Sequence, residues 1–185
     1  MLYTRKGDNG TTKTFGCDQR ISKSSTVAEA LGALDEINSF LGLVRATTSG
    51  MSFETALGEI KFSDLILEVQ QNLFIVQAEV AGSTLTIMAD KVTRIESIVD
   101  EIEKSMPEIK TFFISGATKT GAFFDVARTM ARRAERRVVA AKEEGKIKIS
   151  AETMCYLNRL SSLLYALARI SSYVDGAEEL KPTYE

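Results

Sequence analysis

Apolar residues recur at helical spacing through most of the chain, in long segments that contain no proline. Two such segments cover about 25–45 and 53–82. A third covers 90–106 and begins at an aspartate, a residue type that favours helix N-caps. Two more cover about 121–144 and 150–174, and a glycine follows each within two residues. The pattern predicts an all-α protein, an antiparallel bundle of five helices.

The remaining segments have a different character. Residues 1–23 are polar and contain three glycines, which predicts an ordered loop or a short extended segment, whereas 111–114 (TFFI) is apolar and predicts extended chain. We expect one domain over 1–185, with the helices in 25–176 and a tail at 177–185. The predicted core of the first two helices is Val27, Leu31, Leu34, Ile37, Leu41, Val44, Leu57, Ile60, Leu65, Leu67, Leu73, Val76 and Val80.

Composition narrows the class of protein. Its 44% apolar and 26% charged residues are typical of a globular domain, and a net charge of −2 argues against a nucleic-acid partner. No apolar run approaches the ~20 residues of a membrane span. Cys17 and Cys155 match no metal-site spacing, and no signal-peptide pattern follows Met1. We therefore expect a cytoplasmic protein with no membrane partner.

The chain contains no histidine. It therefore lacks the commonest general base, the commonest metal ligand, and any Ser-His or Cys-His nucleophile pair. If the protein is an enzyme, its chemistry should depend on positioning, on charge and on a reagent brought by a substrate.

Five arginines fall within the ten residues 128–137, and Arg128, Arg132 and Arg136 recur at every fourth position. On a helix these three share one face, with Glu135 at its edge. Three adjacent guanidinium groups favour an anion between them, and a polyphosphate suits the planar donor fork of arginine. The alternative is a helix face exposed to solvent, which is where runs of charged residues more commonly lie.

The segment Thr4-Arg5-Lys6-Gly7-Asp8-Asn9-Gly10-Thr11-Thr12 is a second candidate anion site. Its glycines allow close backbone approach, and its successive N–H groups could form an anion-binding nest. It matches neither the Walker A loop nor G-x-G-x-x-G. Asp-Asn-Gly is also a strong turn signal, so an ordinary turn is the alternative.

Two polar residues lie within apolar helical patterns. Asp35 lies between Leu34 and Ile37, where an unpaired carboxylate would be costly, so we expect either an arginine partner or a border position reaching water. Asn158 adjoins Leu157 in the last helix, where it would contact a nucleotide or satisfy a neighbouring carbonyl.

Five segments together resemble the PduO-type ATP:cob(I)alamin adenosyltransferases, over essentially the whole chain. They are TRKGDNGTT at the N-terminus, RISK at 20–23, EALGALDEINSFLG in the first helix, VARTMARRAERRVV in the fourth and YLNRLSSLLYALAR in the fifth. The resemblance implies a homotrimer of five-helix bundles with active sites at subunit interfaces. It also implies transfer of the 5′-deoxyadenosyl group of ATP to the Co(I) of a reduced corrinoid, with Mg²⁺ on the phosphates and triphosphate released.

The resemblance also implies residue roles. Arg132 would stabilise charge at the transferring end, Arg128 would pair with Asp35 of an adjacent subunit, and Phe112 would form an apolar wall under the corrin. No protein metal ligand is implied. The expected ATP-binding set is Thr4, Arg5, Lys6, Gly7, Thr12, Lys23, Arg132, Arg133, Glu135, Arg136 and Asn158.

Two features of the sequence depart from the family pattern. Ser162 stands where the family usually has an aspartate, and Ser115-Gly116-Ala117 replaces a usual PGG. Both bear on the corrinoid rather than on ATP. The alternatives to an enzyme are a non-catalytic carrier or sensor of ATP or adenosylcobalamin, and a scaffold whose arginines make only inter-subunit ion pairs. A corrinoid reductase and an adenosylcobalamin-dependent enzyme would be the expected protein partners.

Overall fold

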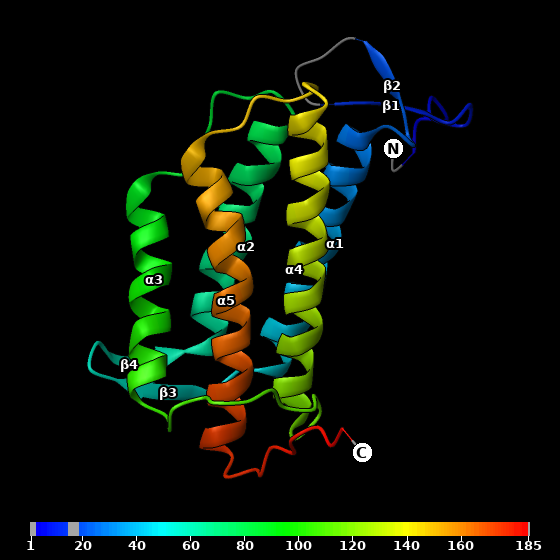
Figure 1. Cartoon of the computed structure of the whole chain (residues 1–185). Helices are drawn as coiled ribbons and strands as arrows, with labels where there is room; N and C mark the ends of the chain where they lie inside the picture. Colours follow the sequence, from blue (N-terminus) through cyan, green and yellow to red (C-terminus); the bar gives the residue numbers. More distant parts are fainter. Residues whose placement is uncertain (1–2, 15–18, 185) are drawn as a thin grey trace.

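The computed structural model describes residues 3–14 and 19–184, and five helices make up most of that part of the chain. Figure 1 shows the helices side by side, with successive helices running in opposite directions. Their bounds are α1 (Thr26–Thr47), α2 (Phe62–Val80), α3 (Ala89–Lys104), α4 (Lys119–Glu143) and α5 (Ala151–Val174). The predicted helical fold is therefore confirmed, although it is not purely helical.

Hydroxyl side chains set three of the helix starts. Ser25, Thr118 and Ser150 each accept a hydrogen bond from the backbone N–H three residues later, which satisfies one of the free donors of the first turn. The predicted cap at Asp90 is wrong. The N-cap position of α3 is Met88, whose side chain accepts no such bond, and Asp90 lies in the first turn, where its charge complements the helix dipole.

The second predicted helix begins too early. A hairpin of β3 (Ser52–Thr55) and β4 (Gly58–Lys61) precedes α2. Its turn is fixed by the Thr55 hydroxyl, which accepts from Leu57 N and donates to the Gly58 carbonyl, and Gly58 has a φ of 94°. Leu57 is consequently 56% exposed. Of the other predicted core positions, Ile60 is half-buried and Leu67 is exposed.

A second hairpin, β1 (Thr11–Lys13) paired with β2 (Arg20–Ser22), forms the N-terminal region and confirms the expected extended segment. Figure 1 shows it projecting beyond the ends of α1 and α4. The predicted extended chain at 111–114 is not a strand: it lies in an irregular segment between α3 and α4.

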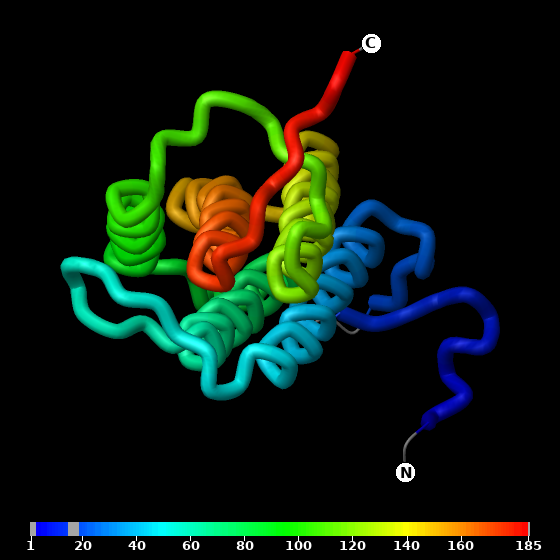
Figure 2. The backbone as a smooth tube through the Cα atoms, turned by 90° about the horizontal axis from the view of Figure 1, so that it is seen from below, coloured from blue at the N-terminus to red at the C-terminus, as the bar shows by residue number. Residues whose placement is uncertain are grey.

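The helices pack in a fixed order. The α4 helix packs against α1 and α5, α2 packs against α1, and α3 packs against α5, as the view along the helices shows (Figure 2). The inward side of α4 is formed mainly by small residues, including Ala127, Ala131, Ala134 and Ala141. Small side chains let neighbouring helices approach closely, so the position of α4 in the bundle is tightly defined.

A buried carboxylate joins α2 to the start of α5. Glu79 accepts hydrogen bonds from Ser150 N at 2.6 Å, from the Thr153 hydroxyl at 2.5 Å and from the Thr86 hydroxyl at 3.1 Å. Its side chain therefore binds the N-terminus of α5, where the helix dipole favours negative charge. No helix in the described part of the chain is both long enough and apolar enough to cross a bilayer.

Candidate active site

A cleft of about 680 Å³ opens between α3, α4, α5 and the irregular segment 105–118. One side of the cleft is formed by aromatic side chains and another by polar ones. The lining includes Phe112, Phe113, Arg128, Arg132, Ser162 and Tyr165. Phe112 is 75% exposed, an unusual position for a phenylalanine unless a ligand or partner covers it. The structure thus brings the predicted residues Phe112, Arg128 and Arg132 together at one cleft, with Ser162 beside them.

The arginines of α4 fall into two groups. Arg133 forms an ion pair with Glu36 of α1. The Nη2 atom of Arg137 lies 3.7 Å from a carboxylate oxygen of Glu29, which is also on α1. These two contacts fit the interpretation of a solvated, ion-paired face. Arg132 and Arg136 are exposed and make neither a hydrogen bond nor an ion pair within the described residues. The alternative therefore accounts for only part of the charge run.

A chain of hydrogen bonds crosses from α3 to α4 beside these arginines. Glu96 accepts from Arg159 Nε at 2.8 Å, Arg159 donates to Asn158 Oδ1 at 2.8 Å, and Asn158 Nδ2 donates to Glu135 at 3.0 Å. Asn158 is exposed rather than buried. The contacts orient the predicted nucleotide-facing residues Asn158 and Glu135 toward each other. Arg159 and Glu96 were not among the predicted residues.

The N-terminal loop is organised by Arg20. Its guanidinium donates to the Lys6 carbonyl and, at 2.7 Å each, to the hydroxyl and the carbonyl of Thr11. Gly7 lies against Lys23: a Cβ at that position would be 3.2 Å from Lys23 Nζ. Arg5 has a φ of 58°, which is uncommon for a residue with a side chain and is found in anion-binding turns. The loop therefore holds the exposed cations Arg5 and Lys6 at its surface, while several of its N–H groups, including those of Lys6, Asp8 and Gly10, are already bonded within the loop.

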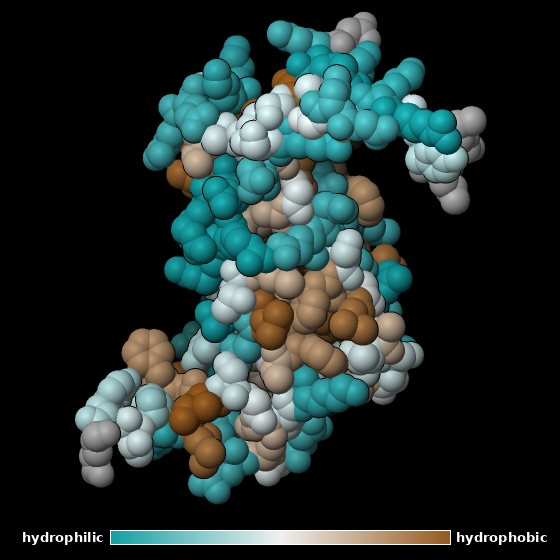
Figure 3. All heavy atoms as spheres, turned by 90° about the vertical axis from the view of Figure 1, so that its right-hand side faces the viewer, coloured by the Kyte–Doolittle hydropathy of each residue, from teal (hydrophilic) through white to brown (hydrophobic). Residues whose placement is uncertain are grey.

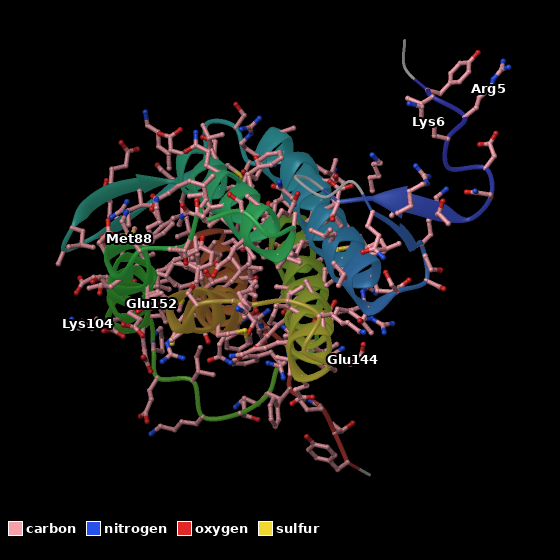
Figure 4. The ribbon with its side chains drawn as sticks, turned by 90° about the horizontal axis from the view of Figure 1, so that it is seen from above. Arg5, Lys6, Met88, Lys104, Glu144 and Glu152 are labelled. Carbon is pink, nitrogen blue, oxygen red and sulfur yellow. The ribbon has the colours of Figure 1, made fainter. Side chains whose placement is uncertain are left out.

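Within one chain, the cations of the N-terminal loop lie apart from the arginines of α4. Figure 4 shows Arg5 and Lys6 on the loop beyond α1, away from the bundle and from the end of α4 at Glu144. Thr4, like Arg5, is exposed, and its hydroxyl accepts from Lys6 N within the loop. Within the described chain, the cleft that Arg132 lines contains no residue of the loop.

Asp35 reaches water, as the alternative of a border position predicted. It is exposed on α1 and makes no hydrogen bond or ion pair within the described residues, so the expected burial cost is absent here. The buried polar residue of that helix is Asn38, whose backbone carbonyl accepts from Gln70 Nε2 at 3.0 Å. Arg128, expected to pair with Asp35 of an adjacent subunit, contacts Asp125 of its own helix at 3.2 Å.

The floor of the cleft holds a buried ion cluster that the sequence analysis missed. Arg169 is 3% exposed and donates to Asp125 at 2.6 Å, with Glu179 of the tail against its other terminal nitrogen. Tyr165 lies beside it, and burial raises the pKa of the Tyr165 hydroxyl, although the Arg169 charge opposes that rise. A lone arginine in an otherwise apolar helical stripe was the only available sign of this cluster.

Comparison with known proteins identifies the family. The sequence model of the cobalamin adenosyltransferases matches residues 2–171. The chain belongs to this family. A corrinoid adenosyltransferase of Bacillus subtilis is 36% identical, with 97% of this chain and 91% of that protein aligned. The corrinoid adenosyltransferase PduO of Salmonella typhimurium is 34% identical over 91% of this chain but only 48% of its own length.

Solved structures of this family have the same fold as this chain. A variant PduO-type ATP:corrinoid adenosyltransferase from Lactobacillus reuteri, complexed with cobalamin and ATP, superimposes with a TM-score of 0.86 at 27% identity, covering 100% of this chain and 97% of that one. A second variant of that enzyme, complexed with ATP, gives a TM-score of 0.84. Cobalamin adenosyltransferases therefore share both the sequence pattern and the helical fold of this chain.

Proposed function

We propose that the protein transfers the 5′-deoxyadenosyl group of ATP to the Co(I) of a reduced corrinoid and releases triphosphate. The observation that carries this proposal is the position of Arg132, an exposed and unpaired cation at the rim of an aromatic cleft. A cleft of about 680 Å³ suits a large apolar ligand, and the neighbouring cations suit a polyphosphate. Family membership supplies the reaction class.

The reaction requires no protein nucleophile. Co(I), brought by the corrinoid, donates an electron pair to C5′ of the ribose. The cobalt–carbon bond forms, the bond from C5′ to the triphosphate oxygen breaks, and cobalt ends as Co(III). Negative charge grows on the leaving triphosphate, so cations fixed beforehand lower the barrier. An enzyme without histidine can perform this chemistry.

The predicted residues divide between the two ends of ATP. Arg132 stabilises the charge that develops on the triphosphate next to C5′, with Arg133 and Arg136 beside it, and Glu135 and Asn158 bind the nucleoside. The loop 1–23 binds the outer phosphates. Its contributing residues are Thr4, Arg5, Lys6, Gly7, Thr12 and Lys23. As the family resemblance implies, Mg²⁺ would be bound by the phosphates of ATP, where it neutralises charge.

The site is completed by a neighbouring subunit. Figure 3 shows apolar side chains gathered on the face formed by α1 and α4, with hydrophilic side chains above them. Leu43 and Val126 are 48% and 43% exposed there, beside Phe40 and Phe123, which pack edge to face with centroids 6.2 Å apart. This face, the unpaired Asp35 and the loop that lies far from its own Arg132 all support a homotrimer with active sites between subunits.

The aromatic side of the cleft would receive the corrin. Phe112 presents its ring to solvent at 75% exposure and would form an apolar wall below the macrocycle. Such a wall excludes a lower axial ligand, which makes Co(II) easier to reduce to Co(I). A corrinoid reductase would supply the electron, and an adenosylcobalamin-dependent enzyme would receive the product.

The test is adenosylation of reduced cobalamin, followed by absorbance as cob(I)alamin disappears, with and without Mg-ATP. We expect ATP-dependent formation of adenosylcobalamin with one triphosphate released per turnover. Tight binding of ATP without conversion would refute the proposal and favour a carrier or sensor. A scaffold predicts no ligand effect at all, whereas ATP at a hundred times its Kd should add about 2.7 kcal/mol to the free energy of unfolding.

A further inference from the structure

The C-terminal tail and the cleft segment 105–118 are fastened to the same buried arginine. Arg169 lies on α5 and is 3% exposed. Its guanidinium carbon is 5.6 Å from the Phe113 ring centroid and 5.1 Å from the Tyr165 ring centroid. Cation–π contacts at this distance are favourable, more so when the cation is desolvated. Phe113 therefore holds the cleft segment against α5 through Arg169.

Two carboxylates neutralise this buried cation. Asp125 accepts from Arg169 Nη2 at 2.6 Å and, through its other oxygen, from Arg128 Nε at 3.2 Å. Glu179 of the tail forms an ion pair with Arg169 Nη1. Asp125 and Glu179 keep only 7% and 15% of their side-chain surface exposed. Two cations and two carboxylates are thus linked in one cluster, to which Arg128 contributes only its Nε.

The tail is also attached directly to the cleft segment. Ile114 N donates to the Leu180 carbonyl at 2.8 Å, two residues from Phe112 and one from Glu179. Glu179 thus secures the tail to Arg169, while Leu180 secures the cleft segment to the tail. Figure 2 shows the tail crossing the ends of α5 and α4 beside that segment.

We propose that Arg169 is a positioning residue for the transfer reaction, holding Arg128 through Asp125 and the Phe112 segment through Phe113 and the tail. This proposal rests on the proposed function, because it assigns a purpose to the cleft. Arg169 sets the spacing between the cation on α4 and the aromatic wall. Arg169 and Glu179 therefore affect the corrinoid side of the site, and ATP binding by the loop and Arg136 is independent of them.

The experiment compares Arg169→Lys and Glu179→Gln with the wild-type protein and with Glu108→Gln. Lysine keeps the charge but loses the planar fork and its stacking, and glutamine keeps the shape but loses the charge. Glu108→Gln is the matched control, because it breaks an exposed ion pair with Lys110 in the same segment. The measurements are KM for corrinoid, KM for ATP and the midpoint of thermal unfolding.

We expect Arg169→Lys and Glu179→Gln to raise KM for corrinoid about tenfold, equivalent to 1.4 kcal/mol. KM for ATP should stay within about twofold in both, and Glu108→Gln should change neither constant. A purely structural role predicts a lower unfolding midpoint with equal losses for both substrates, and that result would overturn the proposal. So would an unchanged KM for corrinoid.

A double-mutant cycle tests the connection to the wall. If Glu179 acts by placing Phe112, then Glu179→Gln should have little further effect on KM for corrinoid in a Phe112→Ala background. Additive effects would overturn the proposal. Should the wild-type protein bind corrinoid without turning it over, the dissociation constant from an absorbance titration replaces KM. The proposed function then fails while the positioning role is still decided.

Discussion

Lys23 Nζ lies 3.2 Å from the position that a Cβ on Gly7 would occupy, and the Thr11 carbonyl lies 3.3 Å from the same point. The flexible lysine end would move aside, whereas the carbonyl of β1 would have to shift by only a few tenths of an ångström. The absence of a side chain at Gly7 is thus what lets Lys23 fold back over the loop.

Gly7→Ala should consequently displace Lys23 and weaken ATP binding about tenfold, by the loss of one charge-assisted contact of about 1.4 kcal/mol. Isothermal titration calorimetry with Mg-ATP measures this. The double variant Gly7→Ala, Lys23→Ala should bind ATP no worse than Lys23→Ala alone. If the two substitutions instead add, Gly7 does not act through Lys23.

Arg132→Ala should lower kcat/KM by about 10² to 10³, the range found when one fixed donor to a developing charge is removed. Its effect on the free energy of unfolding should be below about 0.5 kcal/mol, because the side chain is exposed and has no partner in the described chain. Arg137→Ala is the control: it removes another exposed arginine of α4, one that pairs with Glu29. Equal kinetic losses in the two variants would rule out the special role of Arg132.

Asp35→Asn should weaken subunit assembly and lower activity at low protein concentration, because it removes the carboxylate proposed to pair with Arg128 of an adjacent subunit. Analytical ultracentrifugation measures the assembly. Asp100→Asn, an exposed aspartate on α3, should leave assembly unchanged. An unaltered oligomer in Asp35→Asn would contradict the pairing.

Glu79→Gln should lower the free energy of unfolding by about 1–3 kcal/mol, because a neutral amide cannot accept from Ser150 N, Thr153 and Thr86 as the buried carboxylate does. Urea unfolding measures the change. Glu152→Gln, in the exposed first turn of the same helix, is the matched control. A loss no larger than that of the control would show that Glu79 is not an effective cap.

Tyr156 should make stability fall at alkaline pH. Burial raises the pKa of its hydroxyl, which makes no hydrogen bond within the described residues, although the side chain of Asn72 opposes the rise. Stability is full below about pH 10, where a tyrosine in the unfolded chain ionises, and falls above it, because only the unfolded chain then releases this proton. Urea unfolding between about pH 9 and 11 should show a shallower fall in Tyr156→Phe. Parallel curves would exclude this residue as the cause.

Helix positions could be predicted from sequence where period and capping residues agree. Ser25 and Ser150 mark the starts of α1 and α5 in both the pattern and the structure. The hairpin before α2 was missed because Leu57 and Ile60 continue the apolar spacing of that helix. The turn at Gly58 depends on backbone conformation and on one threonine hydroxyl, which a hydropathy pattern does not record.

The charged residues of the site could be predicted from the sequence, but the contacts between residues far apart in the chain could not. The arginine spacing on α4 and the glycines of the loop are visible in the sequence, as is the exposed Phe112 through its family resemblance. The cluster of Asp125, Arg169 and Glu179 joins residues up to 54 positions apart, and its pairing depends on how α4, α5 and the tail meet. Such long-range contacts leave no local signal in a single sequence.

The small residues on the inward side of α4 have a consequence for which substitutions the protein tolerates. Ala131 is 1% exposed and immediately precedes Arg132 on the helix. A larger side chain there would have no space and would turn or shift α4, moving every arginine on its outer side together. Variation at these buried alanines would therefore resemble active-site damage in its effects, although none of them touches a ligand. The buried side of α4 therefore contributes to function by fixing the position of the arginines on its exposed side.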